Sequence, residues 1–311
     1  MFPKTQIIIN PESNQGRTKK RWEHIKEALK SFIKEFKYEF TEKPLQAAEI
    51  SRAAIKDGME LIVGVGGDGT MNEIANGFFE NDRPINPETT LGIVPSGTGS
   101  DFCRSLNIPL GLKNALQVIT KSPSNMIDIG KVRFRNHSSS EEERFFLNVS
   151  DFGIGGEVVH RMNQERMKKK ASSYFKILIT TFMRYKHKSL RIKIDNEDIP
   201  LQNYMIGAIS NGRIFGKGMK IAPEASLNDG LFDLVLVKEM KKFEFFKNVY
   251  KIYTGTHLSH PKISLFRGRK IDVNPADGQE TVLIEVDGEQ VGSLPATFKI
   301  IPMSLLVKSN L

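Results

Sequence analysis

A glycine-rich turn between a predicted strand and a predicted helix constrains the fold of this chain more than any other stretch. The apolar run from Leu61 to Val65 is typical of a buried strand, and the sequence GGDGT at Gly66–Thr70 ends it. Met71, Ile74 and Ala75 then mark one face of a helix. Glycine permits a sharp turn and a close backbone approach, and a helix start presents free N–H groups. The stretch therefore suits a bound phosphate.

Asp68 lies inside this turn, where its charge would repel a bare phosphate. A divalent cation that bridges the carboxylate and the phosphate oxygens would explain the residue. The alternative is an ordinary strand–helix turn with an aspartate at the helix N-cap, because short glycine motifs also match by chance. The stretch has neither the Gly-Lys-Ser/Thr of a Walker loop nor the GxGxxG spacing.

Strands and helices alternate over the first 127 residues, which predicts a parallel sheet with right-handed crossovers. A second glycine-rich loop, Pro95–Asp101, also follows a predicted strand, and ligands bind at such strand ends. The predicted strands are Thr5–Asn10, Tyr38–Thr41, Leu61–Val65 and Leu91–Val94. The predicted helices include Trp22–Phe36 and Pro44–Ile55, with Gly58 as a C-terminal cap.

After about Ile127 the pattern changes to short alternating runs, which predicts an antiparallel β domain. Ser138–Glu143 is typical of an exposed hairpin tip. Helices are expected from Ser173 to Tyr185 and from Glu244 to Tyr253. The predicted strands are Lys131–Arg135, Arg144–Val149, Leu190–Ile194, Tyr204–Ile209, Leu231–Val237, Lys270–Val273 and Thr281–Val286.

The charge of the chain is concentrated in one segment. The net charge is +9, and nine Lys or Arg and a single acid lie between Arg161 and Lys188. Such a run attracts an anionic membrane surface or nucleic acid. The aromatic and basic interleaving of RNA-binding motifs is absent, so we expect no nucleic-acid partner. A merely solvated face is the alternative.

Three further motifs have both a plain and a functional interpretation. The glycines of Asn211–Met219, followed by Ile221-Ala222-Pro223, form either a wide loop or part of a site. Asn228–Leu231 is a turn signal, and Asp229 within it could ligate a metal. Asp287-Gly288-Glu289 is either a hairpin turn or the source of a general base.

Taken together, these motifs resemble the diacylglycerol kinase catalytic-domain family, which includes soluble bacterial diacylglycerol kinases and the sphingosine and ceramide kinases. Gly66–Glu73 is similar to the nucleotide loop of the family, Pro95–Phe102 to its second loop, and Asn10-Pro11 to its first. Two residues depart from the pattern: Asn14 replaces a glycine, and Ser100 replaces an asparagine. NAD kinases share the GGDGT loop but match less well.

The resemblance implies an α/β N-terminal nucleotide-binding domain with a parallel, NAD-kinase-like sheet, and a C-terminal antiparallel β-sandwich domain. It also implies that the last strand returns to the first domain. We therefore expect a nucleotide-binding domain of residues 1–127 plus 297–311, and a lipid-substrate domain of residues 128–296.

The resemblance also implies the roles of the site residues. Asp68 and Asp101 would hold a catalytic Mg²⁺, and Ser226, Asp229 and Leu231 a structural Mg²⁺. Asp287 and Glu289 both remain candidates for the general base. The residues expected to contact ATP are Asn10, Thr41, Gly66, Gly67, Asp68, Gly69, Thr70, Met71, Asn72 and Thr98.

The implied function is an ATP-dependent lipid kinase that phosphorylates the hydroxyl of a lipid such as diacylglycerol, giving phosphatidic acid. The alternatives are an NAD kinase or other small-molecule kinase, and a catalytically silent binding protein. One cysteine, Cys103, fits the reducing cytosol. We expect a cytoplasmic protein, peripheral at the inner face of an anionic membrane, with acyl chains near the 173–185 helix. Whether the protein forms a homodimer is left open.

Overall fold

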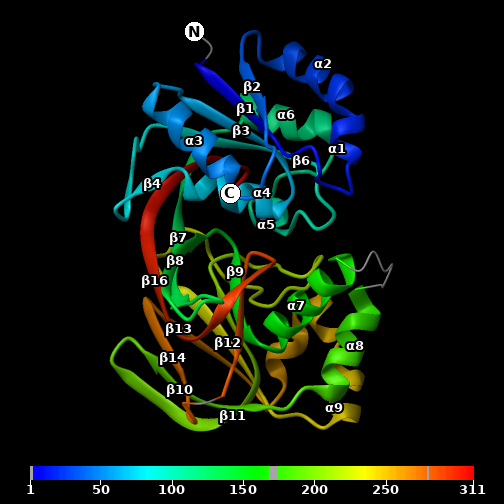
Figure 1. Cartoon of the computed structure of the whole chain (residues 1–311), viewed down its shortest axis with the longest axis vertical. Coiled ribbons are helices and arrows are strands. Elements are labelled where there is room, and N and C mark those ends of the chain that lie inside the picture. Colours follow the sequence, from blue (N-terminus) through cyan, green and yellow to red (C-terminus); the bar gives the residue numbers. More distant parts are fainter. Residues whose placement is uncertain (1–2, 168–173, 279) are drawn as a thin grey trace.

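The structure, a computed structural model, describes residues 3–167, 174–278 and 280–311. Figure 1 shows two parts, with the N-terminal elements in one and most of the later strands in the other. In the first part four strands pair in parallel in the order β2-β1-β3-β6. They are β1 (Thr5–Ile9), β2 (Lys37–Phe40), β3 (Leu61–Gly66) and β6 (Thr90–Pro95).

Helices cover both faces of these parallel strands, which explains why β1 and β3 are continuous apolar runs. Neighbouring side chains enter different cores: Ile8 and Ile62 lie in one, and Ile7 and Val63 in the other. The helices of this part are α1 (Arg17–Lys20), α2 (Trp22–Phe32), α3 (Gln46–Lys56), α4 (Asp68–Asn76), α5 (Asp101–Ser105) and α6 (Leu112–Lys121). A two-stranded hairpin joins β4 (Phe79–Glu80) to β5 (Arg83–Pro84).

The second part is built from antiparallel strand pairs around a separate apolar core that includes Phe146, Phe232 and Phe298. Its strands are β7 (Ser124–Arg135), β8 (Glu141–Phe146), β9 (Val149–Gly153), β10 (Lys188–Ile194), β11 (Glu197–Ser210), β12 (Phe232–Lys238), β13 (Ile263–Gly268), β14 (Lys270–Pro275), β15 (Leu283–Val286) and β16 (Glu289–Lys308). Its helices are α7 (Ile154–Met167), α8 (Tyr174–Arg184), α9 (Lys242–Asn248), α10 (Lys251–Thr254) and the 3₁₀ helix η1 (Thr256–Ser259).

The strands of the first part pair in parallel as expected, but they do not form a sheet of their own, because one sheet of 14 strands runs through both parts. The 20-residue strand β16 makes this connection. It pairs antiparallel with β7, β14 and β15 and, at Leu306 and Val307, parallel with β6. Register shifts along β16 let one strand serve several partners. The C-terminal strand thus lies beside β6, while the predicted domain limits stay a prediction.

Several predicted elements have different bounds in the structure. The predicted strand Arg144–Val149 is two strands, because the N–H groups of Leu147 and Asn148 bind the Asp287 carboxylate instead of a neighbouring strand. The predicted helix Glu244–Tyr253 is the short pair α9 and α10. The predicted hairpin tip is also shorter, since Glu141–Glu143 lie in β8.

Other helix bounds differ as well. Helix α2 ends at Phe32 rather than Phe36, and the glycine-containing start of α7 concealed that helix. Ser173, the predicted start of α8, lies outside the described residues. None of the helices that the structure describes is long and apolar enough to cross a membrane.

Candidate active site

The two glycine-rich loops touch each other backbone to backbone at the ends of β3 and β6. A Cβ on Gly97 would lie 2.4 Å from Cα of Gly67, so only glycine fits there. A Cβ on Gly66 would lie 2.5 Å from Oγ1 of Thr70. Gly67 is the N-cap of α4, so Asp68 is the first residue of the helix and not its cap. The loops and the start of α4 therefore form one surface.

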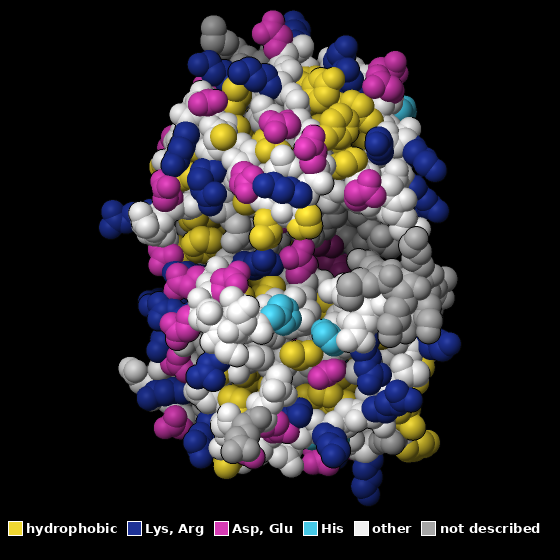
Figure 2. All heavy atoms as spheres, viewed as in Figure 1, with side chains coloured by type: hydrophobic (Ala, Val, Ile, Leu, Met, Phe, Trp, Pro, Cys, Tyr) yellow, Lys and Arg dark blue, Asp and Glu magenta, His cyan; other side chains and the backbone are white. Residues whose placement is uncertain are grey.

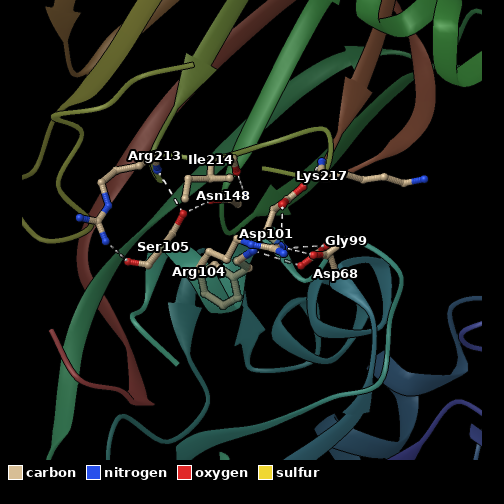
Figure 3. Close-up of polar contacts among 10 residues, drawn as sticks. Asp68, Gly99, Asp101, Arg104, Ser105, Asn148, Arg213, Ile214 and Lys217 are labelled. Atoms are coloured by element: carbon tan, nitrogen blue, oxygen red, sulfur yellow. Dashed lines mark hydrogen bonds and ion pairs between the residues drawn. The ribbon is translucent and has the colours of Figure 1, made fainter. Parts of the chain in front are cut away.

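Asp68 instead caps the neighbouring helix α5. Its carboxylate accepts hydrogen bonds from the N–H groups of Asp101 and Phe102, each at 3.1 Å. Asp101 in turn accepts a hydrogen bond of 2.6 Å from the N–H of Lys217. Figure 3 shows these contacts in a row, with Gly99 and Arg104 beside them. The structure thus brings together Asp68 and Asp101, which were predicted to share a cation.

The electrostatics of this pair suit a bound cation. Burial raises the pKa of Asp68, and backbone N–H groups oppose this effect. Burial, together with the charge of Asp68, raises the pKa of Asp101. A Cβ on Gly99 would lie 3.1 Å from Oδ2 of Asp68 and 3.5 Å from Oδ2 of Asp101, so two hard oxygens flank one point. These residues fit a Mg²⁺ ion, which takes one or two carboxylates and oxygens of the substrate.

The residues predicted to contact ATP are not equally placed for it. Asn10 donates from Nδ2 to Oγ1 of Thr70 at 3.0 Å, which positions the first loop, Asn10-Pro11, against the nucleotide loop Gly66–Glu73. Thr98 is exposed at the loop, whereas Thr41 is buried. Met71 is buried in the core, and its N–H donates within α4, so its side chain lies away from the loop surface.

Asn72 is also buried, and it donates from Nδ2 to Oδ2 of Asp287 at 2.8 Å. Its amide therefore joins the nucleotide loop Gly66–Glu73 to the predicted base motif Asp287-Gly288-Glu289, which sequence spacing could not show. For each of these residues, a role in nucleotide binding stays a prediction.

The two departures from the family pattern fall on residues with positive φ. Asn14 has φ 54° and Ser100 has φ 54°. Glycine and asparagine adopt this left-handed region readily, so asparagine is a fitting replacement at residue 14. Serine is less favoured at residue 100, where it precedes α5 directly.

Asp287 is held by four hydrogen-bond donors. Its Oδ2 accepts from the N–H of Leu147 at 2.7 Å in addition to Asn72, and its Oδ1 accepts from the N–H groups of Asn148 and Val149. Burial raises the pKa of Asp287 to about 6 in spite of these bonds. Asp287 and Gly288 have φ of 47° and 90° between β15 and β16, so the motif is a hairpin turn as well as a buried acid.

Glu289 lies next to Gly69 of the nucleotide loop. Its Oε2 accepts a hydrogen bond of 2.9 Å from Arg144, and its Oε1 would lie 3.0 Å from a Cβ on Gly69. Its side chain is 40% exposed, so it can move, whereas Asp287 is fixed. The two acids of one turn thus face different groups.

The predicted structural metal site lies on the turn before β12. Oδ1 of Asp229 accepts from the N–H of Leu231 at 3.0 Å, and its other oxygen pairs with Arg267. The hydroxyl of Ser226 donates to Asn228 at 2.9 Å. Burial and the charge of Asp229 raise the pKa of Asp128, which lies close by. Among residues 3–167, 174–278 and 280–311, no three His, Cys, Asp or Glu side chains are grouped to hold a metal. The site stays a prediction.

Asp229→Ala tests this prediction. We expect a lower melting temperature in Mg²⁺, because an ion bound only to the native state stabilises it by mass action. The loss of the Asp229–Arg267 pair should lower the melting temperature with or without Mg²⁺. The measurement is thermal unfolding of wild type and variant in Mg²⁺ and in EDTA. Identical melting temperatures of the wild type in both conditions would contradict a structural ion.

The structure adds a second connection between the two parts, which the sequence did not indicate. The hydroxyl of Ser105 in α5 donates to Oδ1 of Asn148 at 2.9 Å, and Nδ2 of Asn148 donates to the carbonyl of Ile214 at 2.5 Å. Arg213 donates to the carbonyl of Ser105 at 3.0 Å (Figure 3). The glycine-rich 211–219 loop therefore binds α5 and is part of the site.

A pair of buried acids was also missed. Asp151 on β9 lies opposite Glu285 on β15, and both are buried. Oδ1 of Asp151 has no hydrogen-bond donor among the described side chains, so a proton shared with Glu285 would satisfy it. The sequence did contain a signal for this pair, because each acid lies inside an apolar run, VSDFG and VLIEV, where a buried carboxyl group needs a partner.

This pair predicts a dependence of stability on pH. Burial raises the pKa of Asp151 from 3.8 to about 7, and burial beside Asp151 raises that of Glu285. A raised pKa in the folded state stabilises the fold at low pH, and this contribution is lost as pH rises through the folded pKa. We expect the pair to lower the melting temperature between about pH 4 and 7, and Asp151→Asn to reduce that decline. Equal declines in variant and wild type would contradict the assignment.

An apolar cavity of about 290 Å³ opens beside these acids. Asp68, Asp101 and Asp287 line it, as do Asp151 and Glu285. Its apolar walls include Met162, Leu178, Phe245 and Ile252, from helices α7 to α10. Figure 2 shows a hollow between the two parts with acidic side chains inside it. A single space thus joins carboxylates to an apolar chamber.

The basic run of Arg161–Lys188 is only partly described. Lys168, Lys169 and Lys170 lie outside the described residues. Lys188 pairs with Glu280 at 2.8 Å and is half-buried, while Arg184 and Lys186 are exposed at the end of α8. The described residues of the run are therefore not all exposed to solvent.

Comparison with known proteins agrees with this architecture. A diacylglycerol kinase catalytic domain model matches residues 4–132, and a YegS C-terminal NAD kinase beta sandwich-like domain model matches residues 148–309. A diacylglycerol kinase of Staphylococcus carnosus is 28% identical over 309 residues, which cover 96% of this chain and 92% of the relative.

Two solved structures share the fold. That of a diacylglycerol kinase from Bacillus anthracis has a TM-score of 0.71 at 19% identity, covering 99% of this chain and 97% of its own. Yeast NADH kinase, in complex with NADH, has a TM-score of 0.56 at 13% identity, covering 100% of this chain and 84% of its own. The two matched domains span nearly the whole sequence in family order. The chain belongs to the diacylglycerol kinase catalytic-domain family, with its NAD-kinase-like C-terminal β domain, and is a kinase-family enzyme.

Proposed function

We propose that this protein is an ATP-dependent lipid kinase that transfers the γ-phosphate of ATP to the hydroxyl of diacylglycerol, giving phosphatidic acid. The observation that carries the proposal is the cavity, which joins Asp68, Asp101 and Asp287 to walls of apolar side chains. A polar substrate such as NAD would gain little from such walls, whereas an acyl chain would be removed from water. At about 290 Å³ the cavity would hold part of a lipid rather than all of it.

The nucleotide would lie on the surface formed by the two glycine-rich loops. Gly67 and Gly97 carry no side chains where they meet beside the start of α4, and the helix dipole there favours the negative charge of a phosphate. Asn10 and Thr70 would hold the first loop in place through their hydrogen bond. Thr98 is exposed and would contact the nucleotide directly.

A Mg²⁺ ion held by Asp68 and Asp101 would neutralise charge on the transferring phosphoryl group. The chain itself would orient these carboxylates, because the N–H groups of Phe102 and Lys217 each bind one of them. Since Lys217 belongs to the second part and Asp101 to the first, closure of the two parts would fix the carboxylate positions.

A carboxylate must take the proton of the lipid hydroxyl as attack proceeds, because the hydroxyl is a very weak acid. Asp287 lines the cavity, and its pKa of about 6 leaves it ionised at neutral pH. Glu289 faces Gly69 and Arg144 instead. We therefore favour Asp287 as the group that meets the hydroxyl and Glu289 as a group near the nucleotide.

The test is labelled ATP with a panel of lipids in mixed micelles, alongside NAD. We expect label in phosphatidic acid when diacylglycerol is present and none in NADP. Label in NADP alone would support the NAD kinase alternative, and no transfer to any acceptor would support a silent binding protein.

We further propose that the enzyme works in the cytoplasm, peripherally, at the inner face of an anionic membrane. Its substrate is membrane-embedded, and its net charge of +9 favours an anionic surface. Lipid-vesicle dependence of ATP turnover tests this setting.

A further inference from the structure

Helices α9 and α10 carry large apolar side chains on a face open to solvent. Phe243 is 80% exposed, Tyr250 62%, Tyr253 51% and Phe246 39%. Their spacing of three, four and three residues places them on one side, since Val249 and Tyr250 between the helices are also in helical conformation. Grouped exposure of this kind marks a surface that meets a partner or a membrane.

The opposite side of the same helices walls the cavity. Phe245, Val249 and Ile252 line it, again at helical spacing. The ring of Phe245 stacks on Phe182 of α8 with 3.9 Å between centroids, which anchors α9. The exposed rings therefore do not result from a lack of apolar partners, because this helix pair has one apolar face inside and another outside.

The charges around the exposed face are positive. Lys241 and Lys247 are exposed, and Lys251 is half-buried. The one acid of α9 and α10, Glu244, is neutralised by Lys262 at 2.7 Å. Within the described part of the chain, none of the three lysines Lys241, Lys247 and Lys251 forms an ion pair. Figure 2 shows Lys and Arg beside apolar side chains near the end of the molecule where Figure 1 places α9.

We propose that this face, defined by Phe243, Phe246, Tyr250 and Tyr253 with Lys241 and Lys247, docks the enzyme on an anionic bilayer. Aromatic rings favour the depth of the lipid headgroups, and lysines attract anionic lipid phosphates. The inference rests on the proposed lipid kinase function. It replaces the basic run of Arg161–Lys188 as the main contact, because that run shows no comparable group of exposed rings among its described residues.

Docking through this face has a consequence for substrate entry. Because α9 and α10 separate the cavity from the proposed bilayer contact, a lipid would cross one helix layer rather than open water. The cavity walls and the docking face would then move together when the helix pair shifts.

The first experiment measures sedimentation with phosphatidylcholine vesicles, with and without phosphatidylglycerol. The test variant is the double substitution Phe243→Ser and Tyr250→Ser, and the matched control is Leu201→Ser, which removes another exposed apolar side chain. We expect the double variant to bind phosphatidylglycerol vesicles roughly tenfold more weakly or worse, since each ring loses its apolar burial. The control should bind like the wild type, and melting temperatures should not change.

Two charge-reversal variants measure the electrostatic contribution of the lysines separately from that of the aromatic rings. Lys247→Glu should weaken binding to phosphatidylglycerol vesicles and reduce its dependence on salt, whereas Lys113→Glu, on the exposed side of α6, should do neither. Wild-type-like binding by the double variant would overturn the proposal. So would loss of binding only on charge reversal of Lys168, Lys169 and Lys170. A wild-type dimer that the double variant abolishes, with vesicle binding unchanged, would show that a second copy covers the face.

The final measurement keeps the docking surface and the proposed function apart. On a short-chain diacylglycerol dispersed in water, the double variant should keep the wild-type kcat, but on the same lipid in vesicles it should lose activity with its binding. If the wild type phosphorylates no lipid at all, the proposed function fails, while sedimentation still decides whether this face docks. Equal loss on dispersed and vesicle substrate would mean that the face acts on the cavity and not on docking.

Discussion

Asp68→Asn is expected to abolish phosphoryl transfer, with kcat lower by roughly 10³-fold or more, because the site loses a charged oxygen where phosphoryl charge must be neutralised. The amide keeps the size of the side chain. Its oxygen can still accept one N–H at the start of α5, but its NH₂ group cannot accept the other. We therefore expect a stability loss of about 1 kcal/mol, typical of a weakened cap.

The measurement combines ATP turnover on lipid vesicles with thermal unfolding of the same preparation. Asp57→Asn is the control, because Asp57 is an exposed acid at the end of α3. A folded Asp68→Asn enzyme with near-normal kcat would show that Asp68 acts only as a cap of α5. A variant that fails to fold is distinguished by its melting curve, and Asp101→Asn then tests the same cation through a different residue.

The βα order of the first half was predictable from local pattern. Strands β1 and β3 are unbroken apolar runs, and the helices between them have one apolar face, so period and turn residues point to the same answer. Gly58, with φ of 79°, lies where a C-terminal glycine was expected. Such signals are contained in neighbouring residues, and no distant contact is needed to interpret them.

The pairing of strands was not predictable in the same way. The two roles of β16 depend on contacts with β7 and β6, which lie more than 150 residues away in sequence. A local pattern sets which side of a strand is apolar but not which strand lies beside it. The sheet that crosses both parts therefore emerged only from the structure.

The site shows the same division. The motifs predicted which acids belong to the site, and the structure adds which hydrogen-bond donors hold these acids in place. The Asp287 carboxylate accepts three hydrogen bonds from the N–H groups of the 147–149 segment. These same bonds interrupt the strand between β8 and β9 and fix the position of the acid. Asp151 and Glu285 could have been suspected, since an acid within an apolar strand needs a partner. Their pairing could not.

The second large effect is expected at the base. Asp287→Asn should lower kcat by roughly 10²-fold or more, because general acid–base catalysis typically contributes that much. An amide at residue 287 also presents N–H groups to backbone N–H donors, so its melting temperature should fall as well. Glu289→Gln should change kcat less and leave stability nearly unchanged, since among the described residues its carboxylate pairs only with Arg144 and is 40% exposed.

The pH dependence of the wild type separates a catalytic from a structural role. Burial raises the pKa of Asp287 to about 6, and the base must be ionised to accept a proton, so kcat/KM should fall as pH drops through about 6. Asp68 and Asp101 also have raised pKa values, and the buried Glu285 lies beside Asp287, so the whole profile is compared between variants. Glu289→Gln should keep the acidic limb if Asp287 is the base. If Glu289→Gln removes that limb and most of kcat, while Asp287→Asn only lowers the melting temperature, Glu289 is the base and Asp287 holds the β8–β9 break.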